Sequence, residues 1–214
     1  MKKLFAAIVI AAAGAAFAET TPAMVSLRTP VQIPARDYDV KGIRLSLIYG
    51  ECETFKGLDI GIINNTTADF TGLAIGGGNI SRDRFYGAAL GFVNCNGSSS
   101  SKWDEVSKGC QVGFVNYAES FCGLQKGLLN IAGGTFTGLQ NSFLNFADDM
   151  NGLQCSPFWI IFGVNVASGT VRGCQIGLVN YAGEIDKGLQ IGLVNILDKG
   201  GIAPVFPIIN GNFR

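Results

Sequence analysis

An eight-residue segment recurs along almost the whole chain and constrains its fold more than any other feature. The segment reads GLQIGLVN at residues 188–195, and related copies begin at Gly57, Gly109, Gly123 and Gly173. The glycines that open the ten units stand at positions 42, 57, 72, 87, 109, 123, 138, 152, 173 and 188. A nearly fixed period of this kind indicates that one small structural unit has been stacked into an array.

Each unit has the sequence pattern of a β-strand followed by a turn. Residues alternate along 189–195, which predicts a strand with two distinct faces. Leu189, Ile191, Leu193 and Asn195 fall on one predicted face, and Gln190, Gly192 and Val194 fall on the other. Short segments such as Ile131-Ala-Gly-Gly134 separate the units and have turn composition after a single large residue. No helix is predicted within the repeats.

Two all-β architectures fit a strand and a turn every 15 residues or so. The first is a β-solenoid, in which each unit is one coil and equivalent residues stack about 4.8 Å apart. The second is a small up-and-down β-barrel, in which the ten units supply ten antiparallel strands. We favour the solenoid, because asparagine ends nearly every unit and only parallel stacking would align these amides into a hydrogen-bonded ladder. The recurring residues are Asn64, Asn79, Asn94, Asn116, Asn130, Asn145, Asn165, Asn180 and Asn195.

Polar residues on both predicted faces also favour the solenoid over the barrel. Lys126 and Asn141 fall on one face, whereas Asp59, Gln125 and Gln140 fall on the other. A barrel surface in contact with lipid would tolerate such residues poorly. The nearly equal lengths of the connections point the same way, since outer-membrane barrels alternate short turns with long loops.

The chain divides into four segments. Residues 1–18 have a charged start, an apolar run and the small-residue pattern Ala16-Phe-Ala18, which predicts a cleaved export signal. Residues 19–41 are expected to cap the array, and residues 42–199 form the repeat domain. That domain has an insertion at 95–108 and an irregular unit at 152–165. Residues 200–214 contain two prolines and are expected to form a C-terminal cap.

Charge and composition exclude several classes of function. The chain has 16 basic and 16 acidic residues. Removal of Lys2 and Lys3 with the signal leaves 14 basic against 16 acidic residues, a net charge of −2. This balance gives no electrostatic basis for binding nucleic acid. The chain has no histidine, which removes the commonest general base and the commonest metal ligand.

The six cysteines all follow the predicted signal, where disulfides could form. Cys95 and Cys110 flank the largest insertion and are the best candidate for a bridge. Cys110 and Cys174 each replace the leucine of a repeat, which suggests small buried apolar side chains. No Cys-x-x-Cys spacing occurs, so a zinc site is not predicted.

The order of these segments resembles that of the leptospiral-type surface-repeat proteins. The resemblance rests on Val31-Gln-Ile-Pro34, on 38–50 (YDVKGIRLSLIYG), on Gly57-Leu-Asp-Ile-Gly61 and on the serial GLQxGLxN units, and it covers residues 31 to about 210. It implies an exported protein of the bacterial envelope with a repeat fold. It implies no catalytic residue and no cofactor, and the insertion after Asn94 and the irregular unit depart from the family pattern.

Few residues suggest a chemical function. Ser99-Ser-Ser-Lys102 matches a Ser-x-x-Lys pattern, but the segment reads as a solvated loop without the other motifs of such enzymes. We therefore expect no catalytic, cofactor-binding or metal-binding residues. The large side chains after the repeat asparagine have two interpretations: we favour that they fill the core at a turn, and the alternative is a candidate binding stripe for a glycan or protein partner. They are Tyr117, Phe146 and Tyr181.

The sequence thus predicts a non-enzymatic repeat protein of the bacterial envelope or cell surface, with a structural or adhesive role. The alternative function is that of a small outer-membrane β-barrel acting as a pore or scaffold. The partner is expected to be a surface component or glycan, with association to the outer membrane as a further expectation. The sequence identifies no specific ligand.

Overall fold

The computed structural model describes residues 20–97, 106–156 and 162–212, and every regular element among them is a β-strand. The strands are β1 (Thr20–Arg28), β2 (Val31–Ile33), β3 (Asp39–Cys52), β4 (Phe55–Thr66), β5 (Phe70–Ser81), β6 (Phe85–Asn96), β7 (Ser107–Val112), β8 (Val115–Ala118), β9 (Phe121–Lys126), β10 (Leu129–Ala132), β11 (Thr135–Asn141), β12 (Leu144–Ala147), β13 (Asp149–Cys155), β14 (Val164–Ile176), β15 (Val179–Lys199) and β16 (Val205–Asn212).

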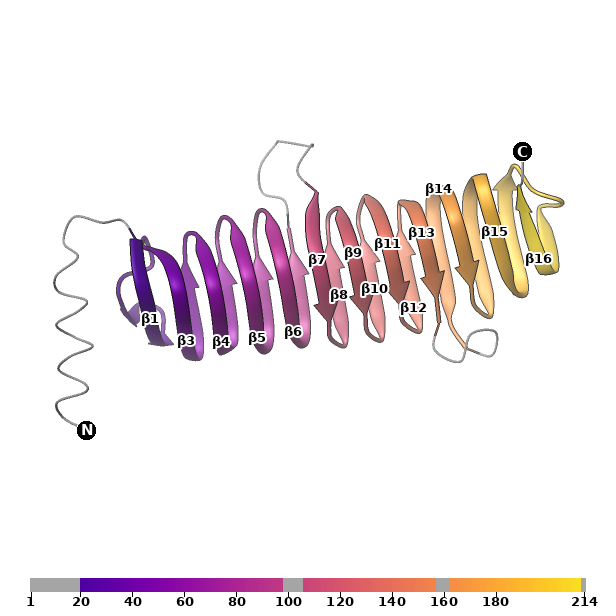
Figure 1. Ribbon diagram of the computed structural model, residues 1–214. Helices are drawn as coiled ribbons and strands as arrows, with labels where there is room; N and C mark the ends of the chain where they lie inside the picture. Colours follow the sequence, from indigo (N-terminus) through magenta and orange to yellow (C-terminus); the bar gives the residue numbers. More distant parts are fainter. Residues whose placement is uncertain (1–19, 98–105, 157–161, 213–214) are drawn as a thin grey trace.

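The strands stack as parallel coils of a β-solenoid, which forms a long rod (Figure 1). Equivalent residues of successive units lie side by side: Gly42 pairs with Gly57, Gly57 with Gly72 and Gly72 with Gly87. The pairing continues through the last unit, where Gly173 pairs with Gly188. The prediction of a solenoid is therefore confirmed. The barrel alternative is wrong, because the strands of consecutive repeats run parallel.

Each coil contributes to two sheets that face one another across a thin core. We call the stack containing β7, β9, β11 and β13 sheet 1, and the stack containing β8, β10 and β12 sheet 2. In the N-terminal half, β4, β5 and β6 each run continuously through both sheets. In the C-terminal half, β14 and β15 join both.

The glycine that opens each unit has a backbone role that no other residue can take. Gly123 has a φ of 143°, a conformation that L-amino acids rarely adopt. A Cβ atom built there would lie 2.0 Å from the carbonyl oxygen of Gly109 in the preceding coil. The coils approach so closely here that the repeat retains glycine at this position.

The two ends of the stack differ from its middle. At the N-terminal end, β1 pairs parallel with β3, and the short β2 folds back antiparallel on β1. At the C-terminal end, β16 pairs antiparallel with β15. The predicted signal at 1–18 and most of the insertion, residues 98–105, lie outside the described residues.

Within the repeated octet the side chains are distributed in an unusual way: the amides lie inside the rod, whereas the leucines and isoleucines next to them lie on its outer face. Gln190 and Asn195 are fully buried, whereas Leu193 is exposed and Leu189 and Ile191 are half-buried. The predicted grouping of Asn195 with the leucines on one face is wrong. Strict alternation fails because the chain turns from sheet 1 to sheet 2 within Gly192–Val194.

Candidate interaction surface

A continuous ladder of asparagine side chains runs through the core. In each rung Nδ2 donates to Oδ1 of the asparagine in the next coil, as from Asn116 to Asn130 at 2.8 Å and from Asn130 to Asn145 at 3.0 Å. The ladder begins at Asn64 and reaches Asn195. The predicted stacking of the repeat amides is confirmed.

A second ladder, made of glutamines, runs the opposite way in sheet 1. Nε2 of Gln125 donates to Oε1 of Gln111 at 2.7 Å, toward the N-terminus of the chain. The remaining rungs link Gln140, Gln154, Gln175 and Gln190 with distances of 2.7–2.9 Å. Because these amides bond to one another inside the rod, their burial is compensated and they are not available to a ligand.

Apolar columns complete the core. Phe55, Phe70 and Phe85 stack in successive coils, with ring centroids 5.3 and 5.1 Å apart. On sheet 2 a column of buried small residues faces them; its later members are Ala118, Ala132, Ala147, Ala167 and Ala182. Large rings opposite methyl groups allow the two sheets to pack closely.

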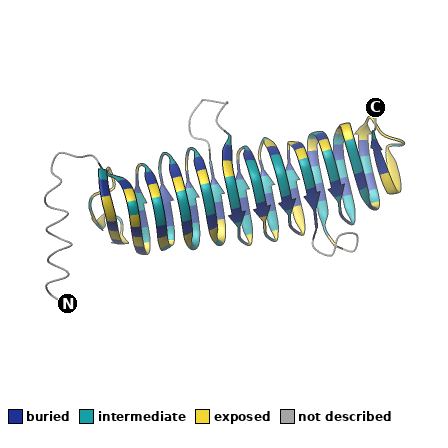
Figure 2. Cartoon of the chain, in the orientation of Figure 1, coloured by how far each residue is buried: buried dark blue, intermediate teal, exposed yellow. Residues whose placement is uncertain are grey.

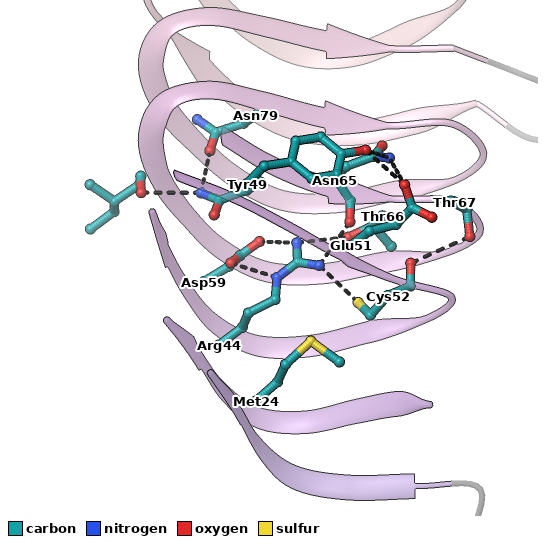
Figure 3. Close-up of polar contacts among 12 residues, drawn as sticks. Met24, Arg44, Tyr49, Glu51, Cys52, Asp59, Asn65, Thr66, Thr67 and Asn79 are labelled. Atoms are coloured by element: carbon teal, nitrogen blue, oxygen red, sulfur yellow. Dashed lines mark hydrogen bonds and ion pairs between the residues drawn. The ribbon is translucent and has the colours of Figure 1, made fainter. Parts of the chain in front are cut away.

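The first coils replace glutamine with a buried ion pair (Figure 3). Arg44 Nε and Nη2 donate to the two carboxylate oxygens of Asp59 at 2.8 and 2.5 Å, and both side chains are buried. Arg44 Nη1 donates to the carbonyl of Asn65 at 2.7 Å and to the sulfur of Cys52 at 3.0 Å. The guanidinium also lies 5.2 Å from the centroid of Phe55. This geometry is that of a fully satisfied structural ion pair.

Burial and charge shift the pKa of Arg44 and that of the neighbouring Cys52 thiol. Burial raises the pKa of the Cys52 thiol to about 11, although the positive charge of Arg44 opposes the shift. Burial opposes the charge on Arg44, but the hydrogen bonds and negative charge of Asp59 outweigh it and raise the pKa of Arg44. The thiol is therefore protonated and the guanidinium charged at neutral pH, a pairing that offers neither a nucleophile nor a base.

A small cavity lies beside the ion pair, where Ala74 occupies the glutamine column. Its lining includes Asp59, Asn64 and Asn96, and its volume of about 10 Å³ is near the minimum that one water molecule needs. Nδ2 of Asn96 and Oδ1 of Asn64 have no hydrogen-bond partner within the protein. The cavity is too small for a substrate.

The outer surface carries the most unusual feature of the molecule. One residue per coil forms the tip of the turn between sheet 1 and sheet 2, along the lower edge of the rod in Figure 2. We define the apolar ridge as the exposed residues at these tips: Leu47, Ile62, Phe92, Phe114, Leu128, Phe143 and Leu193. Phe92 and Phe114 are 62% and 55% exposed, and their rings contact each other edge to face at 5.1 Å. Gly77 interrupts the ridge in the third coil, and Leu178 at the tip of the ninth coil is half-buried. The turn of the eighth coil includes residues 157–161, which lie outside the described residues.

Apolar residues also flank the ridge on both sheets. On sheet 1 the outward columns include Ile43 and Leu45 in β3, Leu58 and Ile60 in β4, and Leu73 and Ile75 in β5. On sheet 2 the column next to the ridge contains Ile63, Val93, Val115, Leu129, Leu144, Val179 and Val194. Lys126 and Asn141 are the outward polar residues that interrupt these columns on sheet 1.

The opposite edge of the rod is polar. Its turns carry exposed Glu53, Glu119, Thr135, Asp148 and Asp198. Outward residues of sheet 1 next to this edge include Lys41, Lys56, Tyr86 and Lys108, all exposed. The rod is therefore amphipathic across its width, with apolar and polar edges on opposite sides.

The aromatic stripe suggested by the sequence lies on the outer side of sheet 2. Tyr117, Phe146 and Tyr181 share one outward column in which Ile131 and Val166 alternate with them. All three are half-buried, and the inward position beside each is taken by an alanine. The Tyr117 hydroxyl donates to Glu119 at 2.9 Å and the Tyr181 hydroxyl to Asp198 at 2.7 Å. The favoured prediction that they fill the core is therefore wrong, because the alanines take the inward positions.

The structure does not bring Cys95 and Cys110 together. Cys95 pairs with Tyr117 in sheet 2, whereas Cys110 pairs with Ala88 and Leu124 in sheet 1. Both face outward on opposite sides of the rod, so the candidate bridge is not formed and both thiols are free. Cys110 and Cys174 are half-buried on the outer face rather than in the core, because the repeat leucines that they replace also face outward.

The sequence reasoning missed the ridge, although a signal was present. The ridge residue follows the second glycine of most units, and it is phenylalanine or leucine in 92, 114, 128 and 193. Alternation along a straight strand does not reveal the ridge, because the ridge residue lies at a corner of the coil between sheet 1 and sheet 2.

No group of three or more Asp, Glu or Cys side chains within the described residues could hold a metal ion. Over the same ranges, no helix is long and apolar enough to cross a membrane. Comparison with protein-family models, curated proteins and solved structures finds no match to this chain.

Proposed function

We propose that this chain is a non-enzymatic, exported scaffold of a bacterial envelope that acts through its outer surface. The single observation that carries the proposal is the exposed apolar ridge. Seven half-exposed side chains of this size present on the order of 600 Å² of apolar surface, at or above the largest patch of a typical monomer, about 300–600 Å². An exposed apolar patch of this size on a rod whose opposite edge is polar marks an interaction site.

The use of the interior supports a scaffold rather than an enzyme. The repeated polar side chains are amides, which do not titrate. Their donors and acceptors are hydrogen-bonded inside the rod, apart from Oδ1 of Asn64 and Oε1 of Gln190 at the ends of the two ladders. The ionisable pair Arg44 and Asp59 is buried and bonded to its own surroundings. A rod whose repeated amides are bonded to one another in its interior is suited to presenting a long surface.

Export is supported by the pattern of residues 1–18, and envelope location by the resemblance to leptospiral-type surface-repeat proteins. The half-buried tyrosines of sheet 2 offer a second surface, suited to a glycan or protein partner.

Expression of the full chain with a C-terminal tag in a bacterial host tests the proposal. We expect cleavage after Ala18 and recovery of the shortened protein in the envelope fraction. A matched chain lacking residues 2–18 should stay in the cytoplasm. Recovery of the full-length, uncleaved chain in the cytoplasm would overturn the proposal.

A further inference from the structure

We propose that the apolar ridge inserts into the hydrocarbon of a lipid bilayer, so that the rod lies along the membrane surface with its polar edge in water. This inference rests on the proposed function and names its partner. Three observations carry the inference: the backbone groups at the ridge are hydrogen-bonded within the protein, the outward side chains follow a fixed order from the polar edge to the ridge, and the ridge is convex.

The backbone at the ridge needs no water. At each turn an amide donates to a carbonyl of a neighbouring coil, as from Leu128 to Phe114 at 3.0 Å and from Leu144 to Leu128 at 3.1 Å. In hydrocarbon an unpaired backbone group costs several kcal/mol, so only chains with satisfied backbones are tolerated there. The ridge meets this requirement along the middle coils.

The asparagine ladder also satisfies backbone groups of the ridge turns, from inside the rod. Besides bonding to the next asparagine, Nδ2 of Asn94 donates to the carbonyl of Val112 at 3.0 Å, and Nδ2 of Asn116 donates to that of Lys126 at 3.0 Å. These carbonyls belong to the residues that enter the ridge turn. The ladder therefore stabilises the turn that carries the apolar tip. The repeated asparagine holds the turn from inside the rod, and the tip is exposed on its outside.

The order of side chains across sheet 1 matches the layers of a membrane surface. In the fifth coil the outward residues from polar edge to ridge are Lys108, Cys110, Val112 and Phe114. Outward residues two apart are separated by about 6.7 Å, so Lys108 stands about 20 Å from the ridge tip. Half the hydrocarbon thickness of a bilayer is about 15 Å. When the ridge tip reaches the middle of the bilayer, Lys108 therefore lies just outside the hydrocarbon, at the level of the lipid phosphates.

Other coils repeat this order. Lys56 takes the same place above Leu58, Ile60 and Ile62, and Tyr86 takes it above Ala88, Leu90 and Phe92. Lysine and tyrosine are the residues that anchor proteins at membrane interfaces. On sheet 2, Tyr117 and Tyr181 lie outside with their hydroxyls bonded to acidic residues of the polar edge. Lys126 lies closer to the ridge, and its flexible stem can extend along sheet 1 toward the interface.

The shape of the ridge favours lipid over a second copy of the chain. The ridge is the convex edge of the rod. From Phe92 to Phe143 its tips occupy four successive coils about 4.8 Å apart, which leaves no room between these tips for those of a partner rod. Acyl chains adapt to a convex edge, whereas two such edges meet poorly. Because the chain without residues 1–18 has a net charge of −2, we expect insertion to depend on apolar contact rather than on anionic lipid.

Flotation of the purified protein, residues 19–214, with phosphatidylcholine vesicles tests the inference. We expect the protein to float, with less than a twofold change on adding phosphatidylglycerol or 0.5 M salt. The triple variant Phe114→Ser, Leu128→Ser, Phe143→Ser should partition at least tenfold more weakly. The control Glu119→Gln, Thr135→Ser, Asp148→Asn alters the polar edge of the same three coils and should float like the parent.

A depth measurement keeps the test independent of the folding of the triple variant. With Trp103 and Trp159 replaced by phenylalanine, a tryptophan at Phe114 should be quenched by lipids brominated in mid-chain, and one at Ser120 on the polar edge should not. Equal quenching at both sites would overturn the bilayer geometry.

Two other results would overturn the inference. One is absence of the parent protein from the floating fraction. The other is a stable dimer, seen by sedimentation in buffer, that the ridge variant dissociates, which would assign the ridge to a second copy. Neither result affects the export and processing measured for the proposed function, so the two failures can be told apart.

Discussion

Asn116 donates from Nδ2 to Oδ1 of Asn130 at 2.8 Å, toward the C-terminus, whereas in sheet 1 the glutamines donate toward the N-terminus. Each amide dipole of one ladder therefore opposes those of the other. Such cancellation reduces the field that a long row of aligned buried amides would otherwise build up inside a rod of low dielectric.

Replacing one rung with an isosteric acceptor tests the ladder. In Asn130→Asp a carboxylate oxygen replaces Nδ2, which donates to Asn145 Oδ1 and to the Gln125 carbonyl, so both hydrogen bonds are lost. The substitution also buries a negative charge. We expect a loss of about 3–5 kcal/mol in the free energy of unfolding, measured by urea denaturation. The control Asn151→Asp, at an exposed position of β13, should change stability by less than about 0.5 kcal/mol. Similar losses in both variants would contradict the ladder's role.

The glycine that opens the repeat should resist substitution, whereas another glycine should not. Gly123→Ala places a Cβ 2.0 Å from a backbone oxygen at a φ of 143°, so we expect a loss of at least about 2 kcal/mol. At Gly78, which stands in register with Val93, an added Cβ would meet only the side chain of Ile63, at 3.9 Å. Gly78→Val should therefore be neutral or stabilise the protein by up to about 1 kcal/mol in thermal denaturation.

The buried ion pair should contribute less net stability to the fold than is lost when one of its two partners is removed. Asp59→Ala leaves Arg44 charged without its main partner, and we expect a loss of about 3–5 kcal/mol. Adding Arg44→Met removes the stranded charge, and Met24 already occupies the same column in the neighbouring strand. The double variant should be more stable than Asp59→Ala alone in denaturant titrations. A double variant that is less stable than the single one would argue against this account.

Stability should fall at alkaline pH because of Cys52. The unfolded thiol ionises near pH 9, while burial raises the pKa of the folded thiol to about 11. The stability contributed by the protonated thiol is complete below pH 9 and is lost as pH rises through 11, by about 2–3 kcal/mol. Cys52→Ala, which introduces the residue of later coils, should lose this part of the pH dependence. An unchanged slope between pH 9 and 11 would show that other groups cause it.

The period, the all-β class and the asparagine ladder could be predicted from sequence, because each depends on residues that recur at fixed spacing. Which residues face the core and which face outward could not be predicted from the sequence. Gln190 and Asn195 are five residues apart and would face opposite sides of a straight strand, yet both are buried because the chain turns between them. The ridge was missed for the same reason, since Leu193 stands at that turn. Burial of amides beneath exposed leucines also reverses the usual preference, which no composition rule anticipates.

The in-register stack means that the length of this rod changes only in whole steps. Residues 121–135 form one complete coil, from Phe121 to the residue before Phe136, its counterpart in the next. Excision of such a segment would bring the rungs at Asn116 and Asn145 together and shorten the rod by about 4.8 Å without altering its cross-section. Duplication would lengthen it by the same amount, so a gene encoding this fold can vary its reach by recombination between repeats while every intermediate length keeps a continuous core.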